Sequence, residues 1–139
     1  MLTLIIVEAA LEMIPKPLWR CPSIIKQSKS RGKKPGELLL DRSYHHFEML
    51  KIKDHKKRGR PDLIHFALSE VTSTPLFLEN RLNVCVHTFD DKVIFLGKSV
   101  RLPKSYFRFE GLMEQLFKEN KIISNGQCLL EILDMDFKK

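Results

Sequence analysis

The chain has 139 residues, 43% apolar and 29% charged, which suits one globular domain over residues 1–139 and excludes disordered and fibrous classes. Glu8 and Glu12 interrupt the longest apolar stretch, which excludes a transmembrane helix of about 20 apolar residues and a signal peptide. The net charge of +7 is local, because residues 16–60 hold 14 Lys and Arg against 4 Asp and Glu. Such an excess predicts a polyanionic partner.

The amino-terminal half has the pattern of an α/β fold. Its predicted elements are a buried strand over 2–9, a helical turn over 10–14, a mobile basic loop over 20–36, a short strand over 37–41 and a helix over 41–52. The first strand is rich in β-branched residues, and Pro15 and Pro17 end the turn that follows. The loop mixes Ser, Gly, Pro and Lys without periodicity. Either Asp41 or Ser43 is expected to cap the helix.

The second half continues this alternation of helices and strands. Its predicted elements are a helix over 61–71, a β-hairpin of strands 82–89 and 93–96, an amphipathic helix from Phe109 to near Asn120, and a short element of undecided type over 128–134. Pro61 suits the first position of a helix, where its missing N–H costs nothing. The short polar link after the strand at 82–89 is typical of a hairpin. No internal repeat is present.

Several kinds of enzyme site are disfavoured. Cys21, Cys85 and Cys128 are far apart and form no CxxC or CxxH pair, which favours reduced thiols in a cytoplasmic protein over a zinc site or disulfides. The adjacent His45 and His46 would point in different directions on a helix, so no metal site is predicted. No glycine loop of the GxGxxG or GxxxxGK[ST] kind occurs, which disfavours nucleotide hydrolysis.

The stretch KKRGRPD, residues 56–62, crowds cations just before a predicted helix. One interpretation is that these are solvated charges in a loop followed by a favourable helix start. Another is that Arg58 and Arg60 bind a phosphate or a nucleobase anion with the free N–H groups of the helix. Asp62 would then orient an arginine or accept a proton. The sequence leaves both interpretations open.

The stretch RLPKSYFRF, residues 101–109, interleaves cations with aromatic rings. This mixture is typical of a surface for single-stranded RNA, because cations contact phosphates and rings stack on exposed bases. The alternative is that the rings are core residues of the next helix, which we expect for Phe109. Docking on an anionic membrane is disfavoured, because the cations lie in predicted loops rather than along one face of a helix.

Five segments together resemble a known family. IIVEAALEMIP, LLLDRSYHH, KKRGRPDLIHFAL, NVCVHTFDDKV and RLPKSYFRFEGLMEQL, in this order, are similar to the archaeal-type small-subunit ribosomal RNA pseudouridine-nitrogen-1 methyltransferases. These are SPOUT-class enzymes and ribosome biogenesis factors. The resemblance implies an α/β knot fold with a carboxy-terminal trefoil knot, a homodimer, S-adenosylmethionine as methyl donor and a ribosomal RNA hairpin loop as substrate.

The resemblance also implies roles for single residues. Arg60 and Asp62 match the catalytic motif. Arg101, Lys104 and Arg108 match RNA contacts of the later motif, and the two stretches themselves add Arg58 and Tyr106 as expected RNA contacts. At position 104 the family usually has arginine, and lysine keeps the charge but loses the planar fork, which favours a phosphate contact. We expect both groups of residues to share one cleft.

A reaction scheme follows from these assignments. The ring nitrogen of pseudouridine becomes a good nucleophile as its proton leaves. Asp62 could take that proton or hold Arg60, and Arg60 could stabilise the negative charge on the neighbouring carbonyl oxygen.

The family's glycine-rich loop and its donor-wrapping segment would lie beyond Lys139. An amino-terminal portion of the fold without the trefoil knot, and with an incomplete donor pocket, is therefore expected. The alternative function is a catalytically inactive rRNA-binding ribosome assembly factor.

Overall fold

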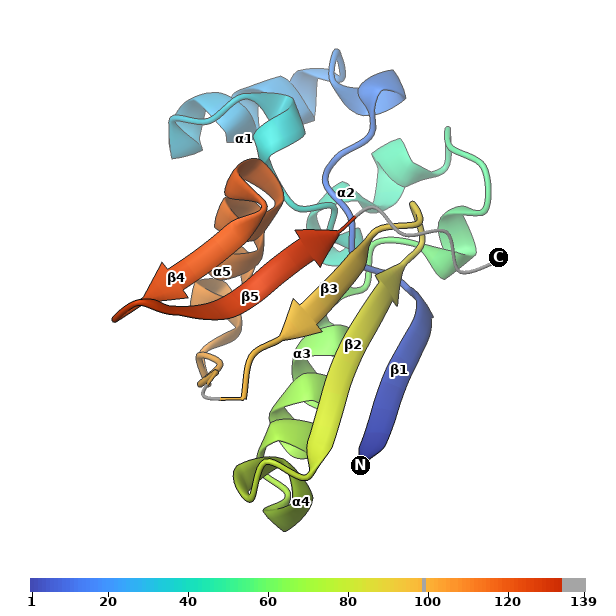
Figure 1. The fold of residues 1–139 in the computed structure, drawn as a ribbon. Coiled ribbons are helices and arrows are strands. Elements are labelled where there is room, and N and C mark those ends of the chain that lie inside the picture. Colours follow the sequence, from blue (N-terminus) through green and yellow to red (C-terminus); the bar gives the residue numbers. More distant parts are fainter. Residues whose placement is uncertain (99, 134–139) are drawn as a thin grey trace.

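A computed structural model describes residues 1–98 and 100–133. Its five strands form one sheet in the order β1-β2-β3-β5-β4 (Figure 1). The strands are β1 Leu2–Ala9, β2 Leu82–Thr88, β3 Val93–Leu96, β4 Lys121–Ser124 and β5 Gln127–Leu133. β1 runs parallel to β2, and the other neighbouring strands are antiparallel. The sheet is therefore mixed, with β1 at one edge.

The helices lie on one side of this sheet and beyond its end (Figure 1). They are α1 Pro22–Arg31, α2 Arg42–Met49, α3 Pro61–Thr72, α4 Pro75–Leu78 and α5 Tyr106–Glu119, with 3-10 turns at Lys16–Leu18, Pro35–Glu37 and His55–Lys57. α3 and α5 lie behind the sheet, whereas α1 and α2 lie past the carboxyl ends of β1 and β2. The connection from β1 to β2 therefore carries most of the helices.

Strong local signals predicted several elements correctly. α3 begins with Pro61 at its first position, and the hairpin of β2 and β3 is antiparallel. Asp41 caps α2, accepting a hydrogen bond from the Ser43 N–H at 2.9 Å. α5 ends at Glu119, with Asn120 as its C-cap, near the predicted end, but it begins at Tyr106, ahead of the predicted start. The undecided element forms β5, and residue 134 lies outside the described residues.

The prediction of a mobile basic loop over 20–36 is wrong for its central part, which forms α1. Pro22 starts this helix and Gly32, with φ +65°, ends it in the left-handed conformation that glycine adopts readily. Ile24 lies on the inner face of this helix and is fully buried. The many polar residues hide the apolar face, so periodicity missed a helix that its start and stop residues indicate.

Three other expectations about the first half are also wrong. Residues 10–14 form no helix, and the segment is extended, with Met13 bridged to Leu39 in an isolated pair. Residues 37–41 therefore form no strand of the main sheet. β1 is not buried, because it lies at the sheet edge, where Leu2 and Val7 are about 60% exposed. β4 and α4 were not predicted at all.

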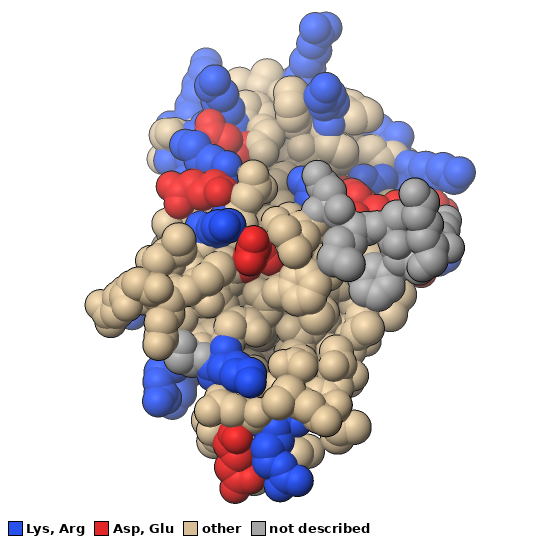
Figure 2. All heavy atoms as spheres, in the orientation of Figure 1, with Lys and Arg blue, Asp and Glu red and all other residues tan. Residues whose placement is uncertain are grey.

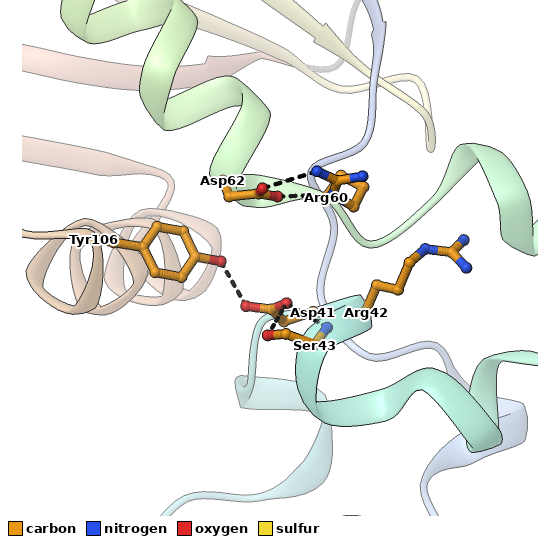
Figure 3. A pocket seen from close by; sticks show the side chains of 6 residues that line it. All are labelled: Asp41, Arg42, Ser43, Arg60, Asp62 and Tyr106. Carbon is orange, nitrogen blue, oxygen red and sulfur yellow. Dashed lines mark hydrogen bonds and ion pairs between the residues drawn. The ribbon is translucent and has the colours of Figure 1, made fainter.

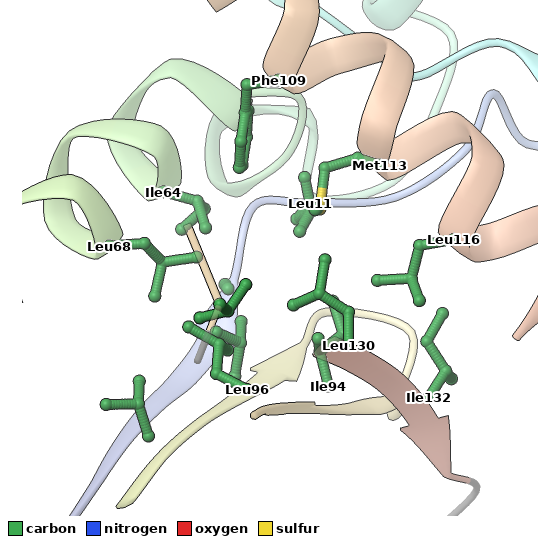
Figure 4. Close-up of a cluster of buried hydrophobic side chains, with 14 of the residues drawn as sticks. Leu11, Ile64, Leu68, Ile94, Leu96, Phe109, Met113, Leu116, Leu130 and Ile132 are labelled. Carbon is green, nitrogen blue, oxygen red and sulfur yellow. The ribbon is translucent and has the colours of Figure 1, made fainter. Parts of the chain in front are cut away.

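Buried apolar residues form two separate clusters. The larger lies between the sheet and helices α3 and α5 (Figure 4). The smaller belongs to the connection after β1 and contains Ile14, Leu18, Cys21, Ile24, Leu38, Leu40, Met49 and Ile52. α1 and α2 therefore pack on an apolar cluster of their own, and polar contacts join that part to α5.

These polar contacts lie along one face of α5, where Tyr106, Glu110 and Glu114 repeat at four-residue spacing. Glu114 accepts hydrogen bonds from Arg31 and Lys33, both at 2.7 Å, and from the Leu39 N–H at 2.9 Å. Tyr106 donates its hydroxyl hydrogen to Asp41 at 2.5 Å. We call these contacts the α5 seam.

Glu110 lies between these two contacts and is only 4% exposed. Burial raises the pKa of its carboxyl to about 7, the negative charges of Asp41 and Glu114 add to this, and Arg31 opposes it. A carboxyl whose pKa is higher in the folded state stabilises that state less as pH rises from about 4.5 to about 7.

We predict that Glu110→Gln removes this pH dependence. The wild-type free energy of unfolding should fall between pH 5 and pH 8, and the variant should be more stable than wild type at pH 8, by at most about 3 kcal/mol. Urea denaturation at both pH values measures the difference. Equal stabilities at pH 8 would contradict the prediction.

Candidate active site

The loop before α3 is held in place by its backbone. The Arg42 N–H donates to the Gly59 carbonyl at 2.7 Å, and the Arg60 N–H donates to the Ala10 carbonyl at 3.0 Å. Gly59 has φ +71°, and a Cβ there would lie 2.8 Å from the side chain of the buried Met49. The glycine of the RGRPD motif is therefore required by the backbone, which places Arg60 beside the end of β1.

Arg60 and Asp62 form a two-point ion pair (Figure 3). Arg60 Nε lies 3.0 Å from Asp62 Oδ1, and Nη2 lies 3.0 Å from Oδ2. The arginine holds the pKa of the Asp62 carboxyl below its usual range, and the carboxylate raises the pKa of Arg60. Their side chains are 42% and 49% exposed. The pair is thus charged at neutral pH and open to solvent.

The ion pair borders a hollow of about 340 Å³ (Figure 3). Six side chains line it, namely Asp41, Arg42, Ser43, Arg60, Asp62 and Tyr106. They come from the first turns, or from the residues just before them, of α2, α3 and α5. The positive ends of the α3 and α5 dipoles therefore converge here beside Arg60, and this favours an anionic group. Arg42 is engaged elsewhere, because its guanidinium donates to the carbonyl oxygens of His55 and Arg58.

One wall of the hollow is fixed by Asp41. Its carboxylate accepts hydrogen bonds from the Ser43 N–H and hydroxyl and from the Tyr106 hydroxyl. Burial and the neighbouring Asp41 raise the pKa of Tyr106. The sequence indicated Asp41 only as a possible helix cap, and Arg42 and Ser43 were not among the expected active-site residues. The adjacency of Asp41, Arg42 and Ser43 at a predicted helix start was the available signal.

Arg58 does not reach this hollow. Its guanidinium binds the carboxylate of Glu12 at 2.5 and 2.9 Å and lies 4.9 Å from the centre of the Phe89 ring. Its side chain is 14% exposed, and that of Glu12 only 4%. The expected RNA contact by Arg58 is thus opposed by this buried ion pair, which anchors the loop instead.

Arg101 and Lys104 line a second hollow, of about 500 Å³. It lies at the opposite end of α3, beside Thr72 and Ser73. Arg108 is exposed on the first turn of α5 and lines neither hollow. The expectation of one shared cleft is therefore wrong, because the predicted residues lie at both ends of α3.

The segment between the two hollows is attached to α3. His65 Nε2 lies 2.8 Å from the carbonyl oxygen of Pro103. Lys104 lies on one side of this contact, in the second hollow, and Tyr106 on the other, in the first. Residues 104–106 therefore run from the second hollow to the first.

Among residues 1–98 and 100–133, no group of three or more His, Cys, Asp or Glu side chains could hold a metal ion. In the same residues, no helix is both long and apolar enough to cross a membrane.

Five of the six side chains that line the first hollow are charged or carry a hydroxyl group, and the ring of Tyr106 is the sixth. Three of them, Asp41, Asp62 and Tyr106, are already bound to neighbouring side chains. None of the six is assigned to S-adenosylmethionine.

The sequence profile of the family described as EMG1/NEP1 methyltransferase matches residues 4–139. Two curated relatives are named ribosomal RNA small subunit methyltransferase Nep1. That of Staphylothermus marinus is 46% identical over 121 residues, covering 87% of this chain and 53% of its own length. That of Thermococcus sibiricus is 47% identical over 132 residues, covering 95% and 60%. The chain thus spans little more than half the length of these relatives.

A solved structure is similar as well. The crystal structure of Archaeoglobus fulgidus Nep1 bound to S-adenosylhomocysteine matches with a TM-score of 0.90 and 37% sequence identity, over 96% of this chain and 60% of that chain. This match confirms the SPOUT-like α/β fold that the resemblance implied.

We predict that Gly59→Ala destabilises the protein by about 1–3 kcal/mol. The left-handed conformation disfavours a Cβ, and the buried Met49 would have to move. Gly111→Ala is the matched control, because nothing lies within 4 Å of a Cβ there and α5 favours alanine. Urea denaturation should show the first variant less stable and the second equal to or above wild type. The reverse order would contradict the backbone requirement.

Proposed function

The chain belongs to the EMG1/NEP1 methyltransferase family, as its motifs implied, and on this basis we propose that it methylates pseudouridine in small-subunit ribosomal RNA. The methyl donor is S-adenosylmethionine, and the substrate is an RNA hairpin loop. The protein acts in the cytoplasm, as a homodimer, in ribosome biogenesis. The observation that carries the proposal is the Arg60–Asp62 pair, where three helix starts converge.

Arg60 stabilises the charge that develops on the nucleobase. When the ring nitrogen of pseudouridine gives its proton to solvent water, which reaches this exposed pair, negative charge spreads onto the neighbouring carbonyl oxygen. A guanidinium held beside that oxygen lowers the energy of this state, and preorganised donors of this kind contribute about 10²- to 10³-fold in rate. The helix ends around the hollow act in the same direction.

Asp62 orients Arg60 rather than acting as the base. The sequence left both roles open. Because Arg60 lowers the pKa of the Asp62 carboxyl, the carboxylate has little tendency to take a proton at neutral pH. Its two contacts with Arg60 instead fix the plane of the guanidinium.

Arg101, Lys104 and Arg108 contact the RNA backbone. The first two line the second hollow, beside two hydroxyl side chains, and Arg108 is exposed nearby on α5. A cation in an open hollow contacts phosphates without selecting a base. Arg58 is left out of these contacts, because Glu12 occupies it. Tyr106 serves as the wall of the first hollow, held by Asp41.

We predict a fixed order of effects for two variants. Arg60→Gln should lower the rate of methyl transfer by about 10²- to 10³-fold, and Asp62→Asn by less, because the arginine remains but is less well held. The double variant should be no slower than Arg60→Gln, because both changes remove one unit. Single-turnover rates at saturating RNA measure this. A slower reaction in Asp62→Asn than in Arg60→Gln would show that Asp62 is the base.

The proposal itself is tested with two RNA oligonucleotides that differ at one position, one with pseudouridine and one with uridine. Transfer of a labelled methyl group from S-adenosylmethionine is expected for the first only. Transfer to neither, with RNA still bound, would favour the catalytically inactive assembly factor. Failure of the chain to bind either RNA would refute both functions.

A further inference from the structure

We propose that Phe107 and the outer face of α1 form a second RNA-contact surface, next to the first hollow. The Phe107 ring stacks on an unpaired base that flanks the target nucleotide, and Lys26 and Lys29 contact the phosphates that follow. We call this the α1–Phe107 surface. It rests on the proposed function, because it takes another part of the same RNA.

Three neighbouring aromatic rings differ in their exposure to solvent, which the sequence alone does not reveal. Phe109 is fully buried in the larger cluster. Tyr106 is half-buried, and its hydroxyl is bound to Asp41. Phe107 is 67% exposed. Successive residues of a helix point about 100° apart, so the ring between a core residue and a wall residue is the one that faces solvent.

A cation lies beside the exposed ring in a fixed position. The Arg31 guanidinium carbon is 5.8 Å from the centre of the Phe107 ring. Arg31 is held there by Glu114 of the α5 seam, at 2.7 Å. A base stacked on this ring would therefore meet an arginine that is already ordered, and cations next to a stacking ring favour nucleic acid.

Two further cations lie on the outer face of α1, roughly opposite the side from which Arg31 reaches Phe107. Lys26 and Lys29 are exposed and lie three residues apart, so they share one face of the helix. Within the described part of the chain no carboxylate lies within ion-pair distance of either one. Lys and Arg side chains gather over this end of the molecule, whereas the sheet carries few (Figure 2). Their charge is thus available to an anionic ligand.

Phe107 follows Tyr106, which lines the first hollow, so its ring lies one residue along α5 from the wall of that hollow. An RNA strand with its target base in the hollow can place the next base on Phe107. A protein partner is a poorer fit, since the surface offers one ring among cations and not the contiguous apolar patch typical of protein interfaces.

The test measures binding of the full chain to a short fluorescent single-stranded RNA that contains one pseudouridine. Phe107→Ala should weaken binding by about tenfold or more, as expected for the loss of one stacked base. Phe107→Leu keeps an apolar side chain without a flat ring and should also weaken binding, whereas Phe107→Trp should preserve it. Phe66→Ala is the matched control, because Phe66 is 68% exposed on α3 and should bind like wild type.

The cations are tested by the salt dependence of the same binding. Replacing Lys26 and Lys29 together by Ala should reduce the slope of log affinity against log salt by about 1.4, which is 0.7 for each phosphate. Lys121→Ala, an exposed cation on β4, should leave the slope unchanged. Circular dichroism confirms that each variant is folded.

Each outcome decides between the two proposals. If RNA binds but Phe107→Ala matches Phe66→Ala and the slope does not change, the α1–Phe107 surface is refuted and the proposed function stands. If Phe107→Leu binds like wild type, stacking is refuted. If the wild-type chain binds no RNA, the proposed function fails and this surface fails with it.

Discussion

The buried ion pair between Arg58 and Glu12 sets the position of everything that follows it in the connection. It joins the segment after β1 to the loop before α3, at 2.5 and 2.9 Å, with both side chains nearly out of solvent. A charge buried in this way without its partner is strongly destabilising, so neither group can be lost alone. With Gly59 in its left-handed conformation, this pair fixes where α3 starts and hence where Arg60 and Asp62 lie.

The contacts of the α5 seam hold the other side of the hollow in place. Glu114 accepts hydrogen bonds from three groups of the connection, and Asp41 receives the Tyr106 hydroxyl. The two apolar clusters are separate, so these polar contacts orient α1 and α2 relative to α5. Leu11 and Leu39 of the connection also pack with α5 in the larger cluster. The position of the hollow therefore depends on this packing together with the polar contacts of the α5 seam. The raised pKa of Glu110 comes first from its burial in this region, and the negative charges of Asp41 and Glu114 add to it.

Sequence predicted those features that depend on neighbouring residues. Pro61 and Asp62 indicated the start of α3, and the alternation of apolar and polar residues over 82–89 indicated β2. Prediction from the sequence failed where a side chain is held by a residue far away in the chain. Nothing near Arg58 reveals that Glu12, 46 residues away, will bind it. The sequence distance between Arg60 and Arg101 likewise does not reveal that they line hollows at opposite ends of α3. Patterns among neighbouring residues determine helices and strands, whereas the pairing of distant charged side chains depends on the whole fold.

The contrast between Arg58 and Arg60 shows why only one of two neighbouring arginines is suited to chemistry. Arg58 uses all three nitrogens, with Glu12 at two of them and the Lys53 carbonyl oxygen at the third. Arg60 uses Nε and Nη2 for Asp62, and no contact of Nη1 is seen among the described residues. A guanidinium has five N–H donors in one plane, so Asp62 can fix that plane and leave other donors of the exposed Arg60 side chain open to a ligand. A fully bonded arginine stabilises a structure, whereas a partly bonded one can stabilise a charge that appears only during reaction.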